Sequence, residues 1–192
     1  ENAAEYLTTG NKRLTDRSVV IYSTVSGNTK EMVQLIDTVK ARGVRVFAFI
    51  DTPGSTLTRE GKWDYLVLYP KNEQLKFFMV ADRFMKNAGE FEDYDEYYAE
   101  MDAHLAQGLV DVEKAADAFG AAYAEKHCND KLHYFVGAGN QYGSTYSYAM
   151  CYWEEQHWLR TKSIHSAEFF HGMLEIIDKD TPVTVFVGED SQ

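Results

Sequence analysis

Residues 17–50, RSVVIYSTVSGNTKEMVQLIDTVKARGVRVFAFI, decide the fold of this 192-residue chain. The β-branched run at 17–23 has no polar alternation, as expected of a strand covered on both faces. A polar turn follows, and residues 29–42 then show apolar side chains at helical spacing, ending before Gly43. The apolar run at 44–50 is the next strand. A strand, a helix and a strand in this order predict a βαβ unit of a parallel sheet.

Two further segments extend this pattern toward the middle of the chain. Residues 65–69 (YLVLY) predict a third buried strand, and residues 72–88 predict a helix. The apolar side chains expected to pack this helix are Leu75, Phe78, Met79 and Phe84. The acidic, aromatic segment 90–100 is either a solvated connector whose rings pack on the lobes or a docking surface for a cationic partner. An alanine-rich helical pattern over 96–127 leads into the second half.

The second half of the chain begins the pattern again. Its predicted segments are a strand at 132–136 (LHYFV), a glycine-rich turn at 137–143, a helix at 144–158, a short segment at 163–166, a helix at 167–177 and a strand at 182–187. Two similar βα units separated by a long helix indicate an internal duplication.

These patterns predict an α/β protein with two parallel-sheet lobes, each an αβα sandwich, joined by a long helix. We place the first lobe at 1–95, the linking helix at 96–130 and the start of the second lobe at 131–192. The sequence opens at Glu1 without a Met and closes at Gln192 just after an apolar strand. We therefore expect both lobes to be incomplete and the chain to be a part of a longer protein.

The composition argues against several classes of partner. The net charge of −11, from 19 Lys and Arg against 30 Asp and Glu, disfavours nucleic acid or an anionic membrane as the main partner. Cys128 and Cys151 are the only cysteines, so neither a disulfide framework nor a zinc site is indicated. The sequence has no apolar run of the roughly 20 residues that a membrane span needs, and no signal peptide is visible. We expect a soluble, cytoplasmic protein.

The turn 23–29 (STVSGNT) is the first candidate site, because it joins a predicted strand to a predicted helix. Helix N-termini carry unpaired N–H groups and partial positive charge, so they attract phosphate even in an acidic protein. Gly27 lets the backbone approach a ligand closely, and the hydroxyls of Thr24, Ser26 and Thr29 add hydrogen bonds. The alternative is structural: Asn28 or Thr29 caps the helix and binds nothing.

The second glycine-rich turn, 137–143 (GAGNQYG), resembles a dinucleotide fingerprint only partly. Its spacing is GxGxxxG, whereas the fingerprint is GxGxxG, and no acidic residue lies at a strand end about 20 residues later. A tight turn from a strand into a helix explains these glycines better than nucleotide binding does.

The densest group of chemically capable residues follows this second turn. Glu155 lies on the predicted helix, and His171 lies in the segment 166–172 (SAEFFHG). A Glu and a His together offer a general base and a proton donor near neutral pH. From composition alone they are equally a solvated Glu and a core His, and the neighbouring Glu154 and His157 offer the same groups.

These motifs resemble the sugar isomerase (SIS) family of sugar-phosphate enzymes. The strand–STVSGNT–helix unit looks like the phosphate loop of SIS domains, and residues 137–146 (GAGNQYGSTY) look like the opening turn of their second repeat. Residues 165–176 (HSAEFFHGMLEI) closely resemble the HSGEFFHGPFEI-like segment of bacterial fructosamine 6-phosphate deglycases, with Ala167 and Met173 replacing the usual Gly and Pro. The isomerase domain of glucosamine 6-phosphate synthase carries a more distant version.

The resemblance implies roles for individual residues. Glu155 would be the proton-transfer base, and His171, sixteen residues later, would assist as the acid. The residues assigned to the substrate phosphate are Thr24, Ser26, Gly27, Asn28 and Thr29, with Ser23, His165 and Glu168 in possible supporting positions. The resemblance implies no metal and no cofactor, and it implies a homodimer or higher homo-oligomer.

The implied reaction is removal of an amino acid from a 6-phosphorylated fructosamine, which yields glucose 6-phosphate. Three alternatives stay open: an aldose–ketose isomerase that uses the same base, a sugar-phosphate sensor without catalysis, and an interaction module built on an SIS dimer. The presence of both Glu155 and His171 favours an enzyme. Only the HSAEFFHG segment separates the deglycase from the isomerase.

Overall fold

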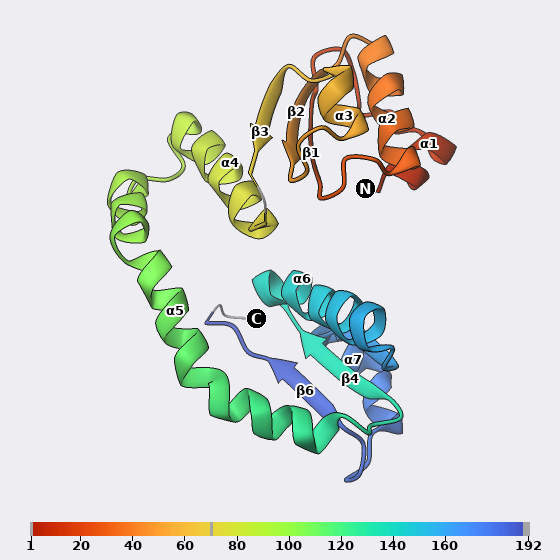
Figure 1. The fold of residues 1–192 in the computed structure, drawn as a ribbon, viewed down its shortest axis with the longest axis vertical. Helices are drawn as coiled ribbons and strands as arrows, with labels where there is room; N and C mark the ends of the chain where they lie inside the picture. Colours follow the sequence, from red (N-terminus) through yellow and green to blue (C-terminus); the bar gives the residue numbers. More distant parts are fainter. Residues whose placement is uncertain (1, 70, 190–192) are drawn as a thin grey trace. The chain divides into compact units, whose positions relative to one another are not determined.

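A computed structural model describes residues 2–69 and 71–189 of the chain (Figure 1). The chain divides into two compact units, Glu1–Glu100 and Met101–Gln192. Each unit contains a three-stranded, all-parallel sheet, which confirms the predicted α/β class with two parallel-sheet lobes. The long helix α5 (Tyr94–His127) is continuous across the boundary between the units. No helix in the described ranges is long and apolar enough to cross a membrane.

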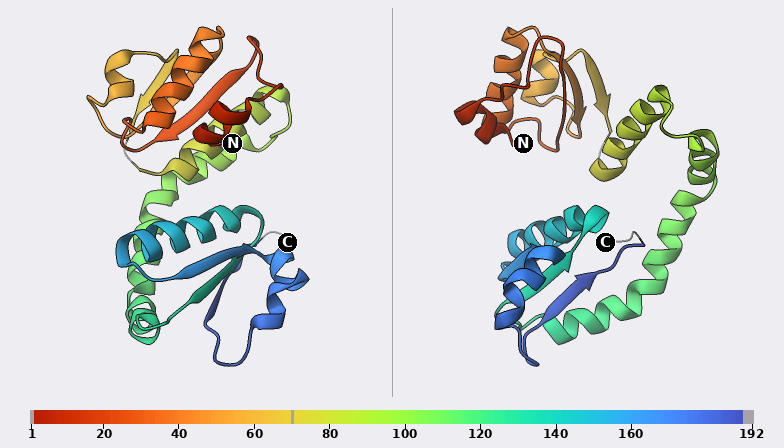
Figure 2. Two further views of the ribbon diagram at one scale, coloured as in Figure 1. Left: turned by 90° about the vertical axis from the view of Figure 1, so that its right-hand side faces the viewer. Right: turned by 180° about the vertical axis from the view of Figure 1, so that it is seen from behind.

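The first unit has the strand order β1-β2-β3. Its strands are β1 (Val19–Thr24), β2 (Arg45–Ile50) and β3 (Tyr65–Leu68), and its helices are α1 (Ala3–Thr9), α2 (Lys30–Ala41), α3 (Thr56–Glu60) and α4 (Glu73–Ala88). Figure 2 shows α2 lying along the strands of this sheet. The β1–α2–β2 unit therefore forms where the sequence predicts it, with boundaries shifted by one or two residues.

One face of the first sheet packs on α2 and forms the core of the unit. Ile36 and Val39 of α2 are fully buried, as are Val46 and Ile50 of β2. They form one apolar cluster, with Tyr22 of β1. Because side chains alternate along a strand, this cluster uses every second residue of β1 and β2. Burial of such side chains contributes about 1.5–3 kcal/mol each.

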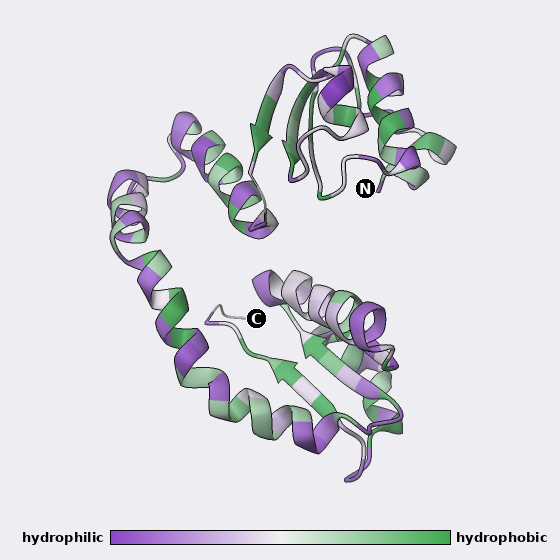
Figure 3. Ribbon diagram, in the orientation of Figure 1, coloured by the Kyte–Doolittle hydropathy of each residue, from purple (hydrophilic) through white to green (hydrophobic). Residues whose placement is uncertain are grey.

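The opposite face of the first sheet is covered less completely. A cavity of about 690 Å³ lies between this face and α4, lined by residues that include Ile21, Phe47 and Val67. Contrary to the prediction, Phe78, Met79 and Phe84 of α4 are 41%, 48% and 60% exposed. The hydropathy colouring of Figure 3 shows apolar residues on both the strands and α4. Helical spacing gives a helix an apolar stripe, but it does not say what covers that stripe.

The second unit has the strand order β5-β4-β6. Its elements after α5 are β4 (His133–Gly137), α6 (Gly139–Ser147), the π-helix η1 (Tyr148–Gln156), β5 (Thr161–His165), α7 (Ser166–His171), the 3₁₀ helix η2 (Met173–Ile176) and β6 (Val183–Phe186). The central strand β4 is buried throughout. Tyr134 and Val136 pack in one cluster with Phe169, and Phe135 packs in another with Trp153.

Three predictions for the second unit are corrected by the structure. Residues 139–143 of the expected glycine-rich turn are already helical, so the turn itself is short. The expected α-helix at 144–158 changes to a π-helix at Tyr148, and the helix expected at 167–177 breaks at Gly172. The segment at 163–166, left unassigned, belongs mostly to the edge strand β5, whose TKSIH sequence is too polar to resemble a buried strand.

Gly137 and Gly143 provide a matched pair for a stability test. A Cβ atom at Gly137 would lie 2.1 Å from the Thr145 Oγ1 atom, whereas a Cβ atom at Gly143 would meet nothing within 4 Å. We expect Gly137→Ala to lower the free energy of unfolding by about 1–3 kcal/mol through overpacking. Gly143→Ala lies inside α6 and should raise it by up to about 1 kcal/mol. Urea unfolding followed by circular dichroism measures both, and equal effects would contradict the packing around Gly137.

Candidate functional site

The turn between β1 and α2 is built around Gly27. Its backbone has φ +61°, and a Cβ atom there would lie 2.2 Å from the Oγ atom of Ser55 and 3.0 Å from a methyl carbon of Ile50. Only glycine satisfies both constraints without displacing a neighbour. The turn therefore brings backbone, not side chain, against the start of α3.

Contacts from the start of α3 fix the position of this turn. The Thr56 amide and hydroxyl both donate hydrogen bonds to the Asn28 Oδ1 atom, at 2.8 and 2.9 Å. The Leu57 amide donates to the Gly27 carbonyl oxygen at 3.1 Å. The Asn28 side chain thus holds the loop through its oxygen, which leaves its NH₂ group as the part that could face a ligand.

The hydroxyls of the turn divide into an inner and an outer group. Thr24 is 9% exposed, and its Oγ1 atom accepts a hydrogen bond from the Gly27 amide at 3.3 Å. Ser26 and Thr29 are exposed, and their hydroxyl oxygens lie 3.5 Å apart. Thr29 is the N-cap of α2 but makes no side-chain capping bond. Two exposed hydroxyls therefore lie at the end of a helix whose first N–H groups have no partner in the helix, which is a suitable arrangement for an anion.

Ser23, a possible supporting residue, lies in β1 just before the turn. Its Oγ atom is buried and has no hydrogen-bond partner in the described part of the chain. A buried hydroxyl without a partner costs about 1–3 kcal/mol, so a further hydrogen-bond partner at this oxygen would stabilise the protein.

A buried ion pair that the sequence analysis missed lies next to the turn. The Lys76 Nζ atom is 2.8 Å from the Asp51 Oδ1 atom, and both side chains are less than 10% exposed. Asp51 follows β2 directly, and its amide donates to the Thr24 carbonyl oxygen at 3.2 Å. The Asp51 Oδ2 atom also accepts a bond from the Lys71 amide. The ion pair thus ties α4 to the ends of β1 and β2, and the position of Asp51 at a strand end was the available signal.

Glu155 lies in the π-helix η1, and its side chain is exposed. Among the described residues it has no side-chain hydrogen bond or ion pair, whereas the neighbouring Glu154 accepts a hydrogen bond from the Thr161 hydroxyl at 2.6 Å. Helices of this rare type occur often at functional sites. Because a π-helix has a wider turn, successive residues are rotated by less than the 100° of an α-helix. The side chains of Glu154 and Glu155 therefore point in directions that differ less than they would in an α-helix.

His171 ends the short helix α7 and is exposed. No hydrogen bond or ion pair joins it to Glu155 in the part of the chain described. His165 instead has a structural role, because its Nδ1 atom accepts a hydrogen bond from the Ala167 amide at 3.2 Å and caps α7. Glu168 is exposed in the first turn of that helix. Glu155 and His171 thus belong to the second unit and the phosphate-loop residues to the first.

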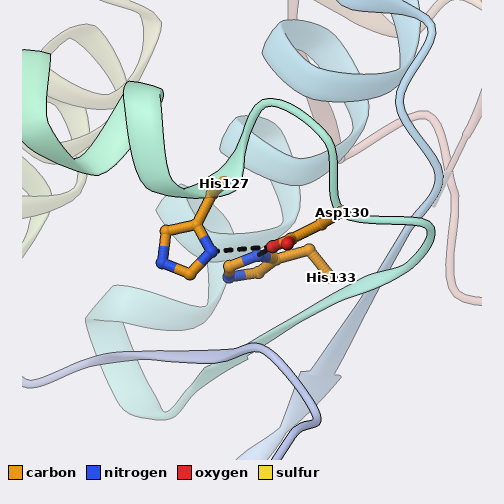
Figure 4. Close-up of side chains that lie close together, drawn as sticks. All are labelled: His127, Asp130 and His133. Carbon is orange, nitrogen blue, oxygen red and sulfur yellow. Dashed lines mark hydrogen bonds and ion pairs between the residues drawn. The ribbon is translucent and has the colours of Figure 1, made fainter.

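A third group of chemically capable residues was not identified from the sequence. Figure 4 shows His127, Asp130 and His133 together, with the carboxylate of Asp130 close to both imidazoles. The Nδ1 atoms of His127 and His133 lie 2.7 and 2.9 Å from the Asp130 Oδ2 atom. The signal was the spacing His-x₂-Asp-x₂-His at the end of α5, although the resemblance to SIS enzymes implied no metal.

Burial and hydrogen bonds together set the protonation of this group. Desolvation lowers the pKa of His133, although its hydrogen bond to Asp130 acts in the opposite direction. Burial acts to raise the pKa of Asp130, but the hydrogen bonds from His133 and His127 outweigh it, so the pKa of Asp130 is lowered. At neutral pH the group therefore contains an ionised carboxylate and, in His133, a neutral imidazole.

Comparison with known proteins shows two kinds of curated relative, while no family model matches the chain. The chain is 28% identical to the fructosamine deglycase FrlB of Bacillus subtilis over 204 residues, which covers 98% of the chain and 59% of that protein. It is 24% identical to a glutamine–fructose-6-phosphate aminotransferase of Clostridium perfringens, over 88% of the chain and 30% of that protein. The chain thus spans less than two thirds of the length of these relatives.

Solved structures share the fold along the whole chain. A Bacillus subtilis protein assigned as a phosphosugar isomerase matches with a TM-score of 0.84 and 26% identity, over all of this chain and 60% of that one. The C-terminal domain of a Francisella tularensis glucosamine-fructose-6-phosphate aminotransferase matches with a TM-score of 0.82 and 20% identity, over all of this chain and 57% of that one. The chain therefore has the fold of phosphosugar isomerases of the SIS type, and its predicted resemblance to these enzymes and to the fructosamine deglycases is confirmed.

Proposed function

We propose that the protein to which this chain belongs removes an amine from a 6-phosphorylated fructosamine, releasing glucose 6-phosphate. The observation that carries the proposal is the turn at Gly27, which presents two exposed hydroxyls at the N-terminus of α2. The similarity to a fructosamine deglycase over 98% of the chain supports the choice of substrate. A fold by itself hosts many reactions, so the proposal depends on these residues and not on the architecture alone.

Phosphate binding is the first step of the proposed reaction. Ser26, Thr29 and the first amides of α2 would hold the phosphate, and Thr24 would support the loop from below. Asn28 would act chiefly by positioning, because its side-chain oxygen is occupied by two hydrogen bonds from Thr56. Backbone amides hold an anion without adding charge, which suits a chain of net charge −11.

Proton transfer at carbon is the second step. Glu155 would take a proton from C1 of the open-chain fructosamine and return it to C2, while His171 assists ring opening as an acid. This transfer converts the ketoamine into an imine of the aldose. Water then adds to C1 of the imine, the C1–N bond breaks, and the amine leaves. The exposure of both side chains is compatible with access for a substrate.

An aldose–ketose isomerase is the second candidate function. It would use the same proton transfer between C1 and C2 but would need no cleavage of a C–N bond. The likeness to proteins assigned as phosphosugar isomerases favours it. Release of a free amine separates the two, because only the deglycase produces one.

Loss of the exposed hydroxyls at the turn should weaken phosphate binding. We expect Ser26→Ala combined with Thr29→Ala to lower the affinity for glucose 6-phosphate about 100-fold or more, since each of the two lost hydrogen bonds to a charged group contributes about 1.5–3 kcal/mol. Thr38→Ala is the matched control, because Thr38 lies farther along α2 and donates to the Gln34 carbonyl oxygen. Calorimetric titration of the full-length protein measures the affinities. An unchanged affinity in the double variant would refute the assignment.

Replacing the proposed base should stop turnover without unfolding the protein. The full-length protein should release glucose 6-phosphate from at least one member of a panel of fructosamine 6-phosphates, and Glu155→Gln should slow that release about 10²–10⁴-fold. His171→Asn should also cripple turnover. A coupled assay for glucose 6-phosphate, with a parallel assay for the free amine, measures both effects.

Glu154→Gln is the control for this comparison. Gln keeps an oxygen to accept the Thr161 hydrogen bond, so stability and turnover should change little. Equal losses in the 154 and 155 variants would show that Glu155 is not the base. Full activity in Glu155→Gln would contradict the mechanism itself.

We also propose that the full-length protein is a homodimer. Leu109, Val112 and Phe119 of α5 are 60%, 65% and 71% exposed, and large apolar side chains on a helix favour burial in an interface. Sedimentation velocity at micromolar concentration should give twice the monomer mass, and replacing Val112 and Phe119 together by Ser should shift the protein toward monomer. A stable monomer in the unmodified protein would contradict this proposal.

A further inference from the structure

We propose that His127, Asp130 and His133 form a binding site for a divalent transition-metal ion such as Zn²⁺. The three side chains come from a segment of seven residues that links the end of α5 to the start of β4. Their ligating atoms all lie within 4.8 Å of one another (Figure 4). The site does not depend on the proposed function, because none of its residues belongs to the phosphate turn or to the Glu155 and His171 pair.

The donor set matches the preference of such an ion. Two imidazole nitrogens and one carboxylate oxygen bind Zn²⁺ at about 2.0–2.2 Å, and three protein ligands leave a fourth position for water. Tetrahedral ligands at that distance are roughly 3.3 Å apart. The two Nδ1 atoms lie 2.7 and 2.9 Å from the Asp130 Oδ2 atom, so these two separations need to open by only about half an ångström.

The surroundings of His133 provide hydrogen-bond partners for the ring nitrogen that would not bind the metal. Its Nε2 atom lies 2.7 Å from the Thr184 Oγ1 atom and 3.1 Å from the Tyr123 hydroxyl oxygen. When Nδ1 binds a metal, Nε2 carries the proton and donates it to such an oxygen, which fixes the orientation of the ring. Thr184 belongs to β6 and Tyr123 to α5, so two further elements hold this histidine.

The three side chains are mostly buried, but one side of the group remains accessible to an ion. The His133 side chain is fully buried, whereas those of His127 and Asp130 are 11% and 19% exposed. An ion could thus enter from the side of His127 and Asp130 and meet a histidine already held in place. Bound there, it would join α5 to β4 and, through Thr184, to β6, which is a structural role.

The same residues also form a complete hydrogen-bonded network without an ion. Both imidazoles can donate Nδ1–H to Asp130, and Thr184 can donate to His133. The two arrangements differ in one respect: a network of hydrogen bonds needs only an acceptor at position 130, whereas Zn²⁺ binds a carboxylate much more tightly than a neutral amide oxygen. Asp130→Asn keeps an acceptor oxygen and removes the charge, so it separates the two.

The test is a metal titration of the tag-free full-length protein after treatment with a chelator. Calorimetry should show one Zn²⁺ bound per chain, and Co²⁺ should give the visible absorption of a tetrahedral site. Asp130→Asn and His127→Ala should each weaken Zn²⁺ binding by about 100-fold or more, and Thr184→Val by about 10–100-fold. His157→Ala is the control, because His157 is exposed and lies outside the group, and it should bind as the unmodified protein does.

Thermal unfolding keeps the proposal testable if a variant is less stable. Zn²⁺ should raise the unfolding temperature of the unmodified protein and of His157→Ala, because an ion that binds only the folded state stabilises it. Zn²⁺ should leave the unfolding temperature of Asp130→Asn unchanged. The proposal is overturned if the unmodified protein binds no stoichiometric Zn²⁺ or Co²⁺, or if Asp130→Asn binds as tightly. It is also overturned if the variants lose stability while Zn²⁺ stabilises none of the proteins, which would leave a hydrogen-bonded network only.

Discussion

At Gly27 the backbone lies so close to α3 that any side chain would overlap Ser55. This one contact sets the path of the chain from β1 into α2 and thus the direction in which the first amides of α2 point. The hydrogen bonds from Thr56 to Asn28 then hold the turn against α3. Close packing between backbone segments therefore fixes the position of the candidate anion site, and polar side chains add hydrogen-bonding groups to it.

The second unit uses the same kind of contact at Gly137, the last residue of β4. There the backbone packs against Thr145, which is fully buried and donates its hydroxyl hydrogen to the Gln141 carbonyl oxygen. Both units thus join a buried parallel strand to a helix through a glycine that has no room for a side chain. The partners differ, because Gly27 meets Ser55 beyond the next strand and Gly137 meets Thr145 in the helix that follows it, so the duplication expected from the order of the segments stays a prediction.

Charge is arranged locally in a protein that is acidic overall. Lys76 is buried, and its ion pair with Asp51 neutralises it beside the candidate anion site. Breaking such a buried pair would cost about 3–5 kcal/mol, because it would leave one charge unpaired. Because Lys76 is neutralised, a phosphate at this candidate site would depend on the amides and hydroxyls at the N-terminus of α2 and on Lys30, the exposed first residue of that helix.

The sequence predicted the elements whose signals are local. Residues 17–50 give β1, α2 and β2 almost to the residue, because β-branched runs, helical spacing and a closing glycine act within a few residues. The same local signals predicted the turn at Gly27 as a candidate anion site. The roles of Glu155 and His171 as a base and an acid came only from the resemblance to SIS enzymes, and all of these roles stay predictions.

Tertiary structure decided the rest. The polar sequence of β5 becomes a strand only because β4 offers it an edge to pair with, and α4 exposes apolar residues that periodicity alone assigned to a core. The connection from the end of α5 to the start of β4 brings together His127, Asp130 and His133. Thr184, 51 residues farther along the chain, contacts His133 from β6. Helical and strand periodicity is a property of neighbouring residues, whereas pairing, burial and hydrogen-bonded clusters depend on segments that only the folded chain brings together.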